Sequence, residues 1–173
     1  DKDSFMMKNG DELLLFHRPH MTDNGFYLTI SKVPKINEGK ALKEITVEET
    51  KVVFEHANFE EKIGWGPPPV QVGKEHLFLL HAVDRKSLAY MVFAALLSLN
   101  EEVSVKAVTP CYIMKPMMPY EVYGDRPYTV FPCGLQEVDG KLLMSYGAGD
   151  SAAAFGEIDL SELMAMLDKN RFD

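Results

Sequence analysis

A short pattern recurs three times along the 173 residues and limits what this chain can fold into. Its copies are GDELLLFHRPH at 10–20, GKEHLFLLHAVD at 73–84 and GKLLMSYGAGD at 140–150. Each copy has a glycine at the start, an apolar run that contains His or Tyr, and a polar end. The aligned residues His17, His81 and Tyr146 are 64 and 65 residues apart. This regular spacing predicts a repeat architecture in which each copy belongs to one structural unit.

Short apolar segments, separated by turn signals, surround each copy of the pattern. Strand-like segments lie at 4–8, 12–18, 26–33, 50–56, 62–72, 76–83, 89–97, 105–114, 128–138, 141–150 and 152–158. Asn9-Gly10 is typical of a hairpin turn because both residue types tolerate positive φ, and a polar connection fills 35–45. Repeated sets of about four short strands are typical of β-propeller blades. A plain β-sandwich is the alternative.

The sequence therefore predicts an all-β partial propeller over 1–173 that ends in a short helix. Its blade-like units are expected at about 1–56, 62–114 and 125–159. After the last unit, Ser161 is a plausible N-cap and apolar residues recur at helical spacing. These features predict the helix over about 161–170.

Composition and charge exclude several classes of partner. The formal net charge is −8, whereas a nucleic-acid surface needs a basic stripe to displace counterions from phosphates. The most apolar stretch, 88–99, has about half the ~20 residues of a membrane-spanning helix, and no signal peptide precedes the first strand. We therefore expect a cytoplasmic protein without nucleic-acid or membrane partners, with Cys111 and Cys133 as buried thiols. No cluster has metal-ligand spacing.

Four segments in collinear order resemble glycoside hydrolase family 130, the β-mannoside phosphorylases and related hydrolases. They are GWGPPPV at 64–70, LLHAVD at 79–84, YTVFPCG at 128–134 and LLMSYGAGDSAAAFGEI at 142–158. The resemblance implies a five-bladed β-propeller, of which this chain is similar to the last three blades. It also implies inverting phosphorolysis of β-1,4-linked mannosides to mannose 1-phosphate. Inorganic phosphate is then the co-substrate, and no cofactor is expected.

The family's proton donor is an Asp in a Glu-Asp-Pro motif on an N-terminal blade, and this sequence contains no such motif. The resemblance therefore places no catalytic acid in this chain. Two alternatives stay open: a family hydrolase that uses water, and an inactive sugar-binding module or truncated remnant. Three blades cannot close a five-bladed ring without leaving sheet edges exposed. We therefore expect a homo-oligomer or an association with the missing N-terminal part of the propeller.

By resemblance, Lys2 and Arg18 match the family's phosphate-binding basic residues, and His20 matches a histidine that contacts the acceptor sugar. A phosphate dianion needs such cations, and Arg offers a planar fork of donors. The alternatives are a frayed terminal lysine for Lys2 and a surface ion pair for Arg18. Asp150 resembles a carboxylate that hydrogen-bonds sugar hydroxyls, with ordinary turn chemistry as its alternative.

Three further residues are weaker candidates for contact with the sugar. Asp84 ends the middle copy of the pattern as Asp150 ends the last, but a solvated loop explains it equally well. Trp65 and Phe131 offer aromatic faces for sugar rings, with packing anchors as the alternative.

Overall fold

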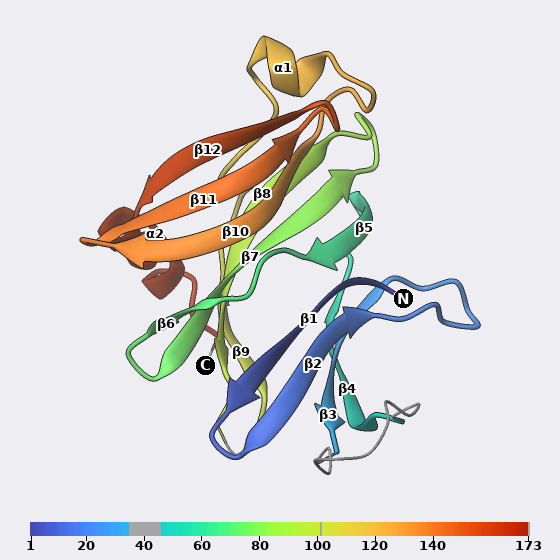
Figure 1. Cartoon of the computed structure of the whole chain (residues 1–173), viewed down its shortest axis with the longest axis vertical. Coiled ribbons are helices and arrows are strands. Elements are labelled where there is room, and N and C mark those ends of the chain that lie inside the picture. The colour runs from blue at the N-terminus through green and yellow to red at the C-terminus, as the bar shows by residue number, and fades with distance from the viewer. Residues whose placement is uncertain (35–45, 101, 173) are drawn as a thin grey trace, which may run out of the picture.

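The computed structural model describes residues 1–34, 46–100 and 102–172, so the polar connection at 35–45 lies outside the described part. Three antiparallel sheets follow one another along the chain (Figure 1). Sheet 1 has the order β1 (Lys2–Asn9), β2 (Glu12–Arg18), β3 (Tyr27–Val33), β4 (Glu48–Glu55). Sheet 2 has the order β5 (Glu60–Trp65), β7 (Glu75–Asp84), β8 (Tyr90–Ser98), β9 (Ser104–Val108), with β6 (Val70–Val72) also paired to β7. Sheet 3 has the order β10 (Val130–Val138), β11 (Lys141–Ala148), β12 (Ala152–Asp159).

The recurring pattern of the sequence falls on the second strand of each sheet path, namely β2, β7 and β11. The hairpin before each of these strands contains a glycine in the left-handed region, with φ of 59° at Gly10, 61° at Gly73 and 78° at Gly140. His17, His81 and Tyr146 are all buried near the far ends of their strands. The spacing therefore reflects one strand-turn-strand unit used three times.

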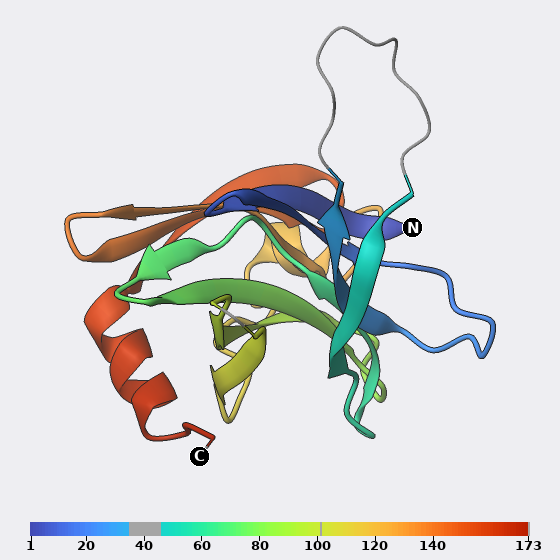
Figure 2. The same cartoon turned by 90° about the horizontal axis from the view of Figure 1, so that it is seen from below.

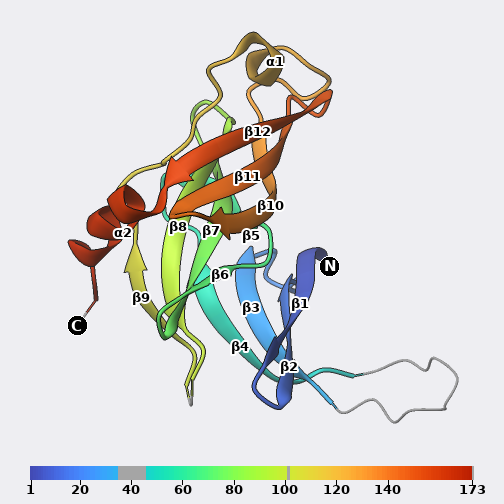
Figure 3. The ribbon, with the colours of Figure 1, turned by 60° about the vertical axis from the view of Figure 1, so that its left-hand side comes forward.

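Two apolar cores separate the sheets, with sheet 2 in the middle (Figure 3). Alternate side chains of β7 point to opposite faces, so Phe78 and Leu80 join the core shared with sheet 1. Leu77 and Leu79 join the second core, which includes side chains of sheet 3 and α2 (Leu160–Asp168). Burial on both faces explains why β7 and β8 are continuous apolar runs in the sequence rather than alternating ones.

Two predicted strands are wrong in their extent because prolines interrupt them. The segment expected at 62–72 is divided into β5 and β6, since Pro67, Pro68 and Pro69 have no N–H to donate to a ladder. The strand expected at 105–114 ends at Val108, just before Pro110.

The two helices differ from each other in how well the sequence predicts them. The C-terminal helix is confirmed, although its N-cap is Asp159, whose side chain accepts a hydrogen bond from the Glu162 N–H at 3.0 Å. The predicted cap Ser161 instead donates to Asp159. A four-residue helix, α1 (Pro119–Val122), was not predicted. Helix α2 lies at the side of the molecule away from the N-terminus (Figure 2).

The expectation for the cysteines is wrong in one respect. Cys111 and Cys133 form no disulfide, as expected, but both are exposed rather than buried. Among the described helices, none combines the length and hydrophobicity needed to cross a membrane.

Candidate functional site

Three of the predicted site residues lie around one cavity of about 290 Å³. Lys2 begins β1 and Arg18 ends β2, and the two residues face each other in the ladder. His20 follows in the loop after β2 and also lines the cavity. Lys62 on β5 adds a cation from the neighbouring sheet that the sequence did not reveal. The remaining wall is Pro19, Met21, Asn24, Gly25 and Phe26.

Arg18 is held firmly at this cavity and is only 7% exposed. Its Nη1 donates to the Ile63 carbonyl at 2.6 Å, and its Nη2 lies 3.0 Å from Asp3 Oδ2. The guanidinium carbon also lies 5.5 Å from the centre of the Phe26 ring, within the range of a cation–π contact. The other N–H donors of the guanidinium remain for a ligand.

Asp3 completes the group, although no pattern in the sequence assigned it a role. Its φ is 53°, an uncommon value for a residue with a Cβ. Burial raises the pKa of the Asp3 carboxyl, while the nearby charges of Arg18, Lys2 and Lys62 act to lower it. The carboxylate therefore lies in a partly desolvated site beside three cations.

His81 lies beneath this group, with its Nε2 3.6 Å from Asp3 Oδ2. Burial, together with the charges of Arg18 and Lys62, lowers the pKa of His81 to about 3. The ring is therefore neutral near pH 7 and adds no charge to the site. It packs against Phe131, with 4.4 Å between ring centres, and against Tyr90 at 5.9 Å.

The aromatic candidates make packing contacts. Trp65 is 1% exposed, its Nε1 donates to the His17 carbonyl at 3.1 Å, and its ring meets Phe16 and Phe78 edge-on or tilted. A buried ring cannot stack on a sugar from solvent, so the geometry supports the packing anchor for Trp65. Phe131 is half-buried, and its ring packs against the His81 ring in a tilted arrangement.

Neither acidic candidate lines the cavity, and Asp84 is half-buried whereas Asp150 is exposed. Asp84 Oδ1 accepts bonds from the Ser87 N–H at 2.8 Å, the Ser87 hydroxyl at 2.7 Å and the Lys86 N–H at 3.2 Å. The bonds from Ser87, chiefly, lower the pKa of Asp84, so its oxygen is engaged in the loop after β7, in line with the loop alternative given for this residue. Asp150 has φ of 51° and follows Gly149, whose carbonyl accepts a bond from the Arg126 N–H at 3.0 Å.

Two cation–π contacts at the Tyr90 ring, one of them from Lys62, were also not predicted from the sequence. The Tyr90 ring has Lys62 Nζ 5.3 Å and Arg126 Cζ 4.5 Å from its centre. Tyr90 begins β8 and stacks on His81, so it connects the Lys2–Arg18 cavity with the segment that carries α1. Lys62 and Tyr90 lie on non-adjacent strands of sheet 2 and Arg126 lies in a loop, so no spacing in the sequence signals these cation–π contacts.

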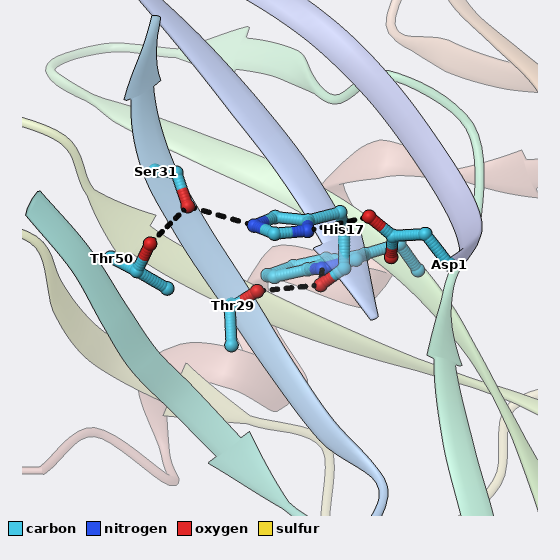
Figure 4. A network of polar contacts seen from close by, with 6 residues as sticks. Asp1, His17, Thr29, Ser31 and Thr50 are labelled. Carbon is cyan, nitrogen blue, oxygen red and sulfur yellow. Dashed lines mark hydrogen bonds and ion pairs between the residues drawn. The ribbon is translucent and has the colours of Figure 1, made fainter. Parts of the chain in front are cut away.

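A buried polar network on sheet 1 has the order of a nucleophilic triad (Figure 4). Asp1 Oδ2 lies 2.9 Å from His17 Nδ1, and His17 Nε2 lies 2.7 Å from Ser31 Oγ. Ser31 is fully buried and shares a 2.7 Å hydrogen bond with Thr50. A substrate cannot reach this hydroxyl, so the network is structural.

A larger cavity of about 830 Å³ lies near the Asn9-Gly10 turn, away from the basic group. Its two lysines are neutralised, since Lys32 pairs with Glu12 and Glu49, and Lys51 pairs with Glu102. In the described ranges no group of three His, Cys, Asp or Glu side chains is arranged to hold a metal ion. The smaller basic cavity is therefore the better candidate for binding an anion.

The three successive antiparallel sheets are arranged like propeller blades, and the basic cavity lies at their strand ends. The model of glycoside hydrolase family 130, described as β-1,4-mannooligosaccharide phosphorylase, matches residues 1–169. The chain belongs to this family.

Named relatives agree with this assignment. A β-1,2-mannobiose phosphorylase of Listeria innocua is 31% identical over 107 residues, which are 62% of this chain and 30% of the relative. Another from a Thermoanaerobacter species is 33% identical over 96 residues, 56% of this chain and 32% of the relative. The chain thus aligns with about a third of these curated relatives.

Solved structures show the same fold. The Listeria innocua β-1,2-mannobiose phosphorylase, in complex with β-1,2-mannobiose, superposes with a TM-score of 0.84 at 24% identity, over 98% of this chain and 47% of that one. A structure described as a family 130 glycoside hydrolase that targets β-1,2 mannosidic linkages gives a TM-score of 0.68 at 17% identity, over 90% and 45% of the two chains. The three sheets therefore match about half of a five-bladed propeller.

Proposed function

We propose that this chain supplies the phosphate side of the active site of an inverting β-mannoside phosphorylase. The observation that carries the proposal is the cavity in which Lys2, Arg18 and Lys62 converge beside His20. Three cations and the carboxylate of Asp3 leave two positive charges in excess, which suits a phosphate dianion. An uncharged sugar alone does not need such a cluster.

The proposed reaction uses phosphate as nucleophile. A phosphate oxygen bonds to the anomeric carbon as the glycosidic C–O bond breaks, and the leaving oxygen takes a proton from a carboxylic acid. The products are mannose 1-phosphate and the released sugar. This sequence has no Glu-Asp-Pro motif, so we propose that the acid comes from the part of the propeller outside these residues.

We propose that the substrate is a β-mannoside with either a β-1,4 or a β-1,2 linkage. The family is described with β-1,4-mannooligosaccharides, as the sequence resemblance implied. The two relatives above are described as β-1,2-mannobiose phosphorylases. Both linkages are therefore tested together.

Two alternatives lead to different products. A hydrolase would use water, and an inverting hydrolase normally needs a second carboxylate to activate it. The basic cavity favours phosphate over this alternative. A non-catalytic sugar-binding module is favoured only by the missing acid motif, and it predicts binding without turnover.

The test is a chimera that joins this chain to the segment of the Listeria innocua phosphorylase that precedes the matched half. It is incubated with phosphate and either β-1,2- or β-1,4-mannobiose, and products are followed by phosphorus NMR and sugar analysis. Mannose 1-phosphate supports the proposal. Free mannose alone supports the hydrolase, and binding without product supports the sugar-binding module.

Variants connect the activity to the cavity. Replacing Arg18 by Lys removes bidentate, charge-assisted hydrogen bonds worth about 1.5–3 kcal/mol, so kcat/KM for phosphate should fall about 10- to 100-fold. Lys62→Gln should have an effect in the same direction. Lys32→Gln, at the other cavity, is the matched control and should keep the parent rate. Equal losses in all three variants would contradict the assignment of the site.

A further inference from the structure

The conformation of Asp3 is the starting observation, because it is costly for a residue with a Cβ. In the left-handed region the Cβ of a non-glycine residue comes too close to the following carbonyl oxygen, and Asn and Asp tolerate this conformation best. At φ of 53°, Asp3 turns its side chain inward from β1, and only 12% of that side chain is exposed. The ladder between β1 and β2 shifts register just here, between the Lys2 and Phe5 pairs. The backbone is thus distorted at the residue of β1 whose carboxylate lies 3.0 Å from Arg18.

Asp3 acts on Arg18 from behind rather than on the cavity itself. It is absent from the residues that line the cavity, whereas Arg18 lines it. The guanidinium is held on one side by Asp3 at 3.0 Å and on another by the Ile63 carbonyl at 2.6 Å. Nη1 donates a hydrogen bond to that carbonyl, whereas Asp3 Oδ2 forms an ion pair with Nη2 that lacks hydrogen-bond geometry, and the two contacts locate the guanidinium beside the cavity.

The surrounding residues leave room for this contact. A Cβ added to Gly64 would collide with Asp3 Oδ2 and with the His81 ring. Glycine at 64 therefore allows β5 to pass directly over the Asp3–His81 pair. His81 is neutral near pH 7, so Arg18 is the charged partner of the carboxylate.

We propose that Asp3 is the positioning residue of the phosphate site, and that its carboxylate fixes the direction in which Arg18 presents its free N–H donors to the anion. This inference rests on the proposed function. Because Asp3 does not line the cavity, the proposal has it act on the anion only through Arg18.

Charge alone predicts the opposite effect, which makes the inference testable. A carboxylate near the cavity repels an anion, so removing its charge should tighten phosphate binding if orientation did not matter. If the orientation of the Arg18 guanidinium dominates, the same change should weaken phosphate binding because the guanidinium loses its contact with the Asp3 carboxylate.

The experiment is Asp3→Asn in the 173-residue chain, with inorganic phosphate binding measured by isothermal titration calorimetry. Asn has nearly the same shape and tolerates the left-handed conformation, and thermal unfolding checks that the variant is folded. We expect phosphate to bind about tenfold more weakly, as for the loss of one charge-assisted contact. Unchanged or tighter binding by the folded variant would overturn the inference.

A second variant disturbs the contact without removing any charge. Gly64→Ala should displace Asp3 from Arg18 and weaken phosphate binding in the same direction. Gly147→Ala is its control, because an added Cβ there meets no atom closer than 4.0 Å. If Gly64→Ala binds phosphate as the wild type does, the Asp3–Arg18 contact does not control phosphate binding and the positioning role is wrong.

A third measurement separates this inference from the proposed function. The side-chain N–H signals of Arg18, assigned in nitrogen-15 NMR spectra with the Arg18→Lys variant, should be sharp in the wild type and broadened in Asp3→Asn. This readout needs no phosphate. Failure of the wild type to bind phosphate would count against the proposed function alone, whereas sharp Arg18 signals in Asp3→Asn would count against the role of Asp3.

Discussion

Single residues determine how the site responds to acid, and His81 is the main one. Burial lowers its pKa to about 3, against about 6.5 in an unfolded chain. Between these values the unfolded chain binds a proton that the folded chain does not, so stability is present above about pH 6.5 and is lost as the pH falls. His17 has its pKa lowered by burial as well and adds in the same direction.

We therefore predict that the free energy of unfolding falls between pH 6.5 and pH 5, and that His81→Gln reduces this fall by about 2 kcal/mol. Urea unfolding at several pH values measures it. Between pH 8 and 7 the two proteins should show the same slope, which serves as the internal control. Parallel curves down to pH 5 would contradict the neutral, buried state of His81. The raised pKa of Asp3 acts in the opposite sense, and removing His81 should expose that opposing trend.

Some of the site was predictable from the sequence at this scale, and some was not. Lys2, Arg18 and His20 were predicted from the resemblance to the family, and the structure places them around one cavity. Lys62 and Asp3 were missed because their roles depend on strands that are adjacent only after folding. Trp65 was ambiguous for a related reason, since an aromatic residue beside Gly and Pro has the same sequence signature in a core or at a surface.

At the scale of elements, the glycine hairpins before β2, β7 and β11 establish the repeat. Asp139 and Gly140 have φ of 50° and 78°, and both occupy the region that a two-residue turn of this type requires. The adjacent hydrogen bond from the Gly140 N–H to Glu137 Oε1, at 2.8 Å, fixes the turn.

We predict that Gly140→Val destabilises the chain by about 1–3 kcal/mol, because a β-branched residue is strained at this φ. The midpoint of urea unfolding, compared with that of the wild type, gives the value. Gly147→Ala lies in an ordinary part of β11, where an added methyl meets only contacts of 4.0 Å, and it should change stability far less. Equal effects of the two substitutions would show that the turn does not limit stability.

The presence of the strands was easier to predict from the sequence than the residues at which they end. Helix α1 was also harder to predict than the strands. Alternation, β-branched residues and turn dipeptides identified most strands, whereas Pro67–Pro69 and Pro110 determined where two of them stop. Helix α1 has four residues and no periodic signal. Its position depends instead on Glu121, which accepts bonds from the Met117 and Met118 N–H groups and from Tyr146 on sheet 3.

At the scale of the whole molecule, sheet 3 has one face in the core and the other in solvent. Leu142, Met144 and Tyr146 are buried against sheet 2. On the opposite face Phe155 pairs with Ser145 and is a diagonal neighbour of Leu143, and the exposed fractions of Phe155 and Leu143 are 84% and 43%. Within the described ranges, β12 pairs only with β11 and leaves its other edge open. An apolar face beside an open edge favours association with another chain.

We therefore predict that the 173-residue chain self-associates in a concentration-dependent way, measured by size exclusion with light scattering. Burying a Phe side chain contributes about 1.5–3 kcal/mol, so Phe155→Thr should raise the concentration of half-association about tenfold or more. Tyr123→Thr removes a side chain that is 75% exposed but lies beyond α1, away from this face, and should leave association unchanged. The same face should be protected when the N-terminal half of the Listeria innocua relative is added, because a neighbouring blade would then cover it. A chain that stays monomeric at every concentration would show that this face is stable in water, and the half-propeller would then not require a partner for solubility.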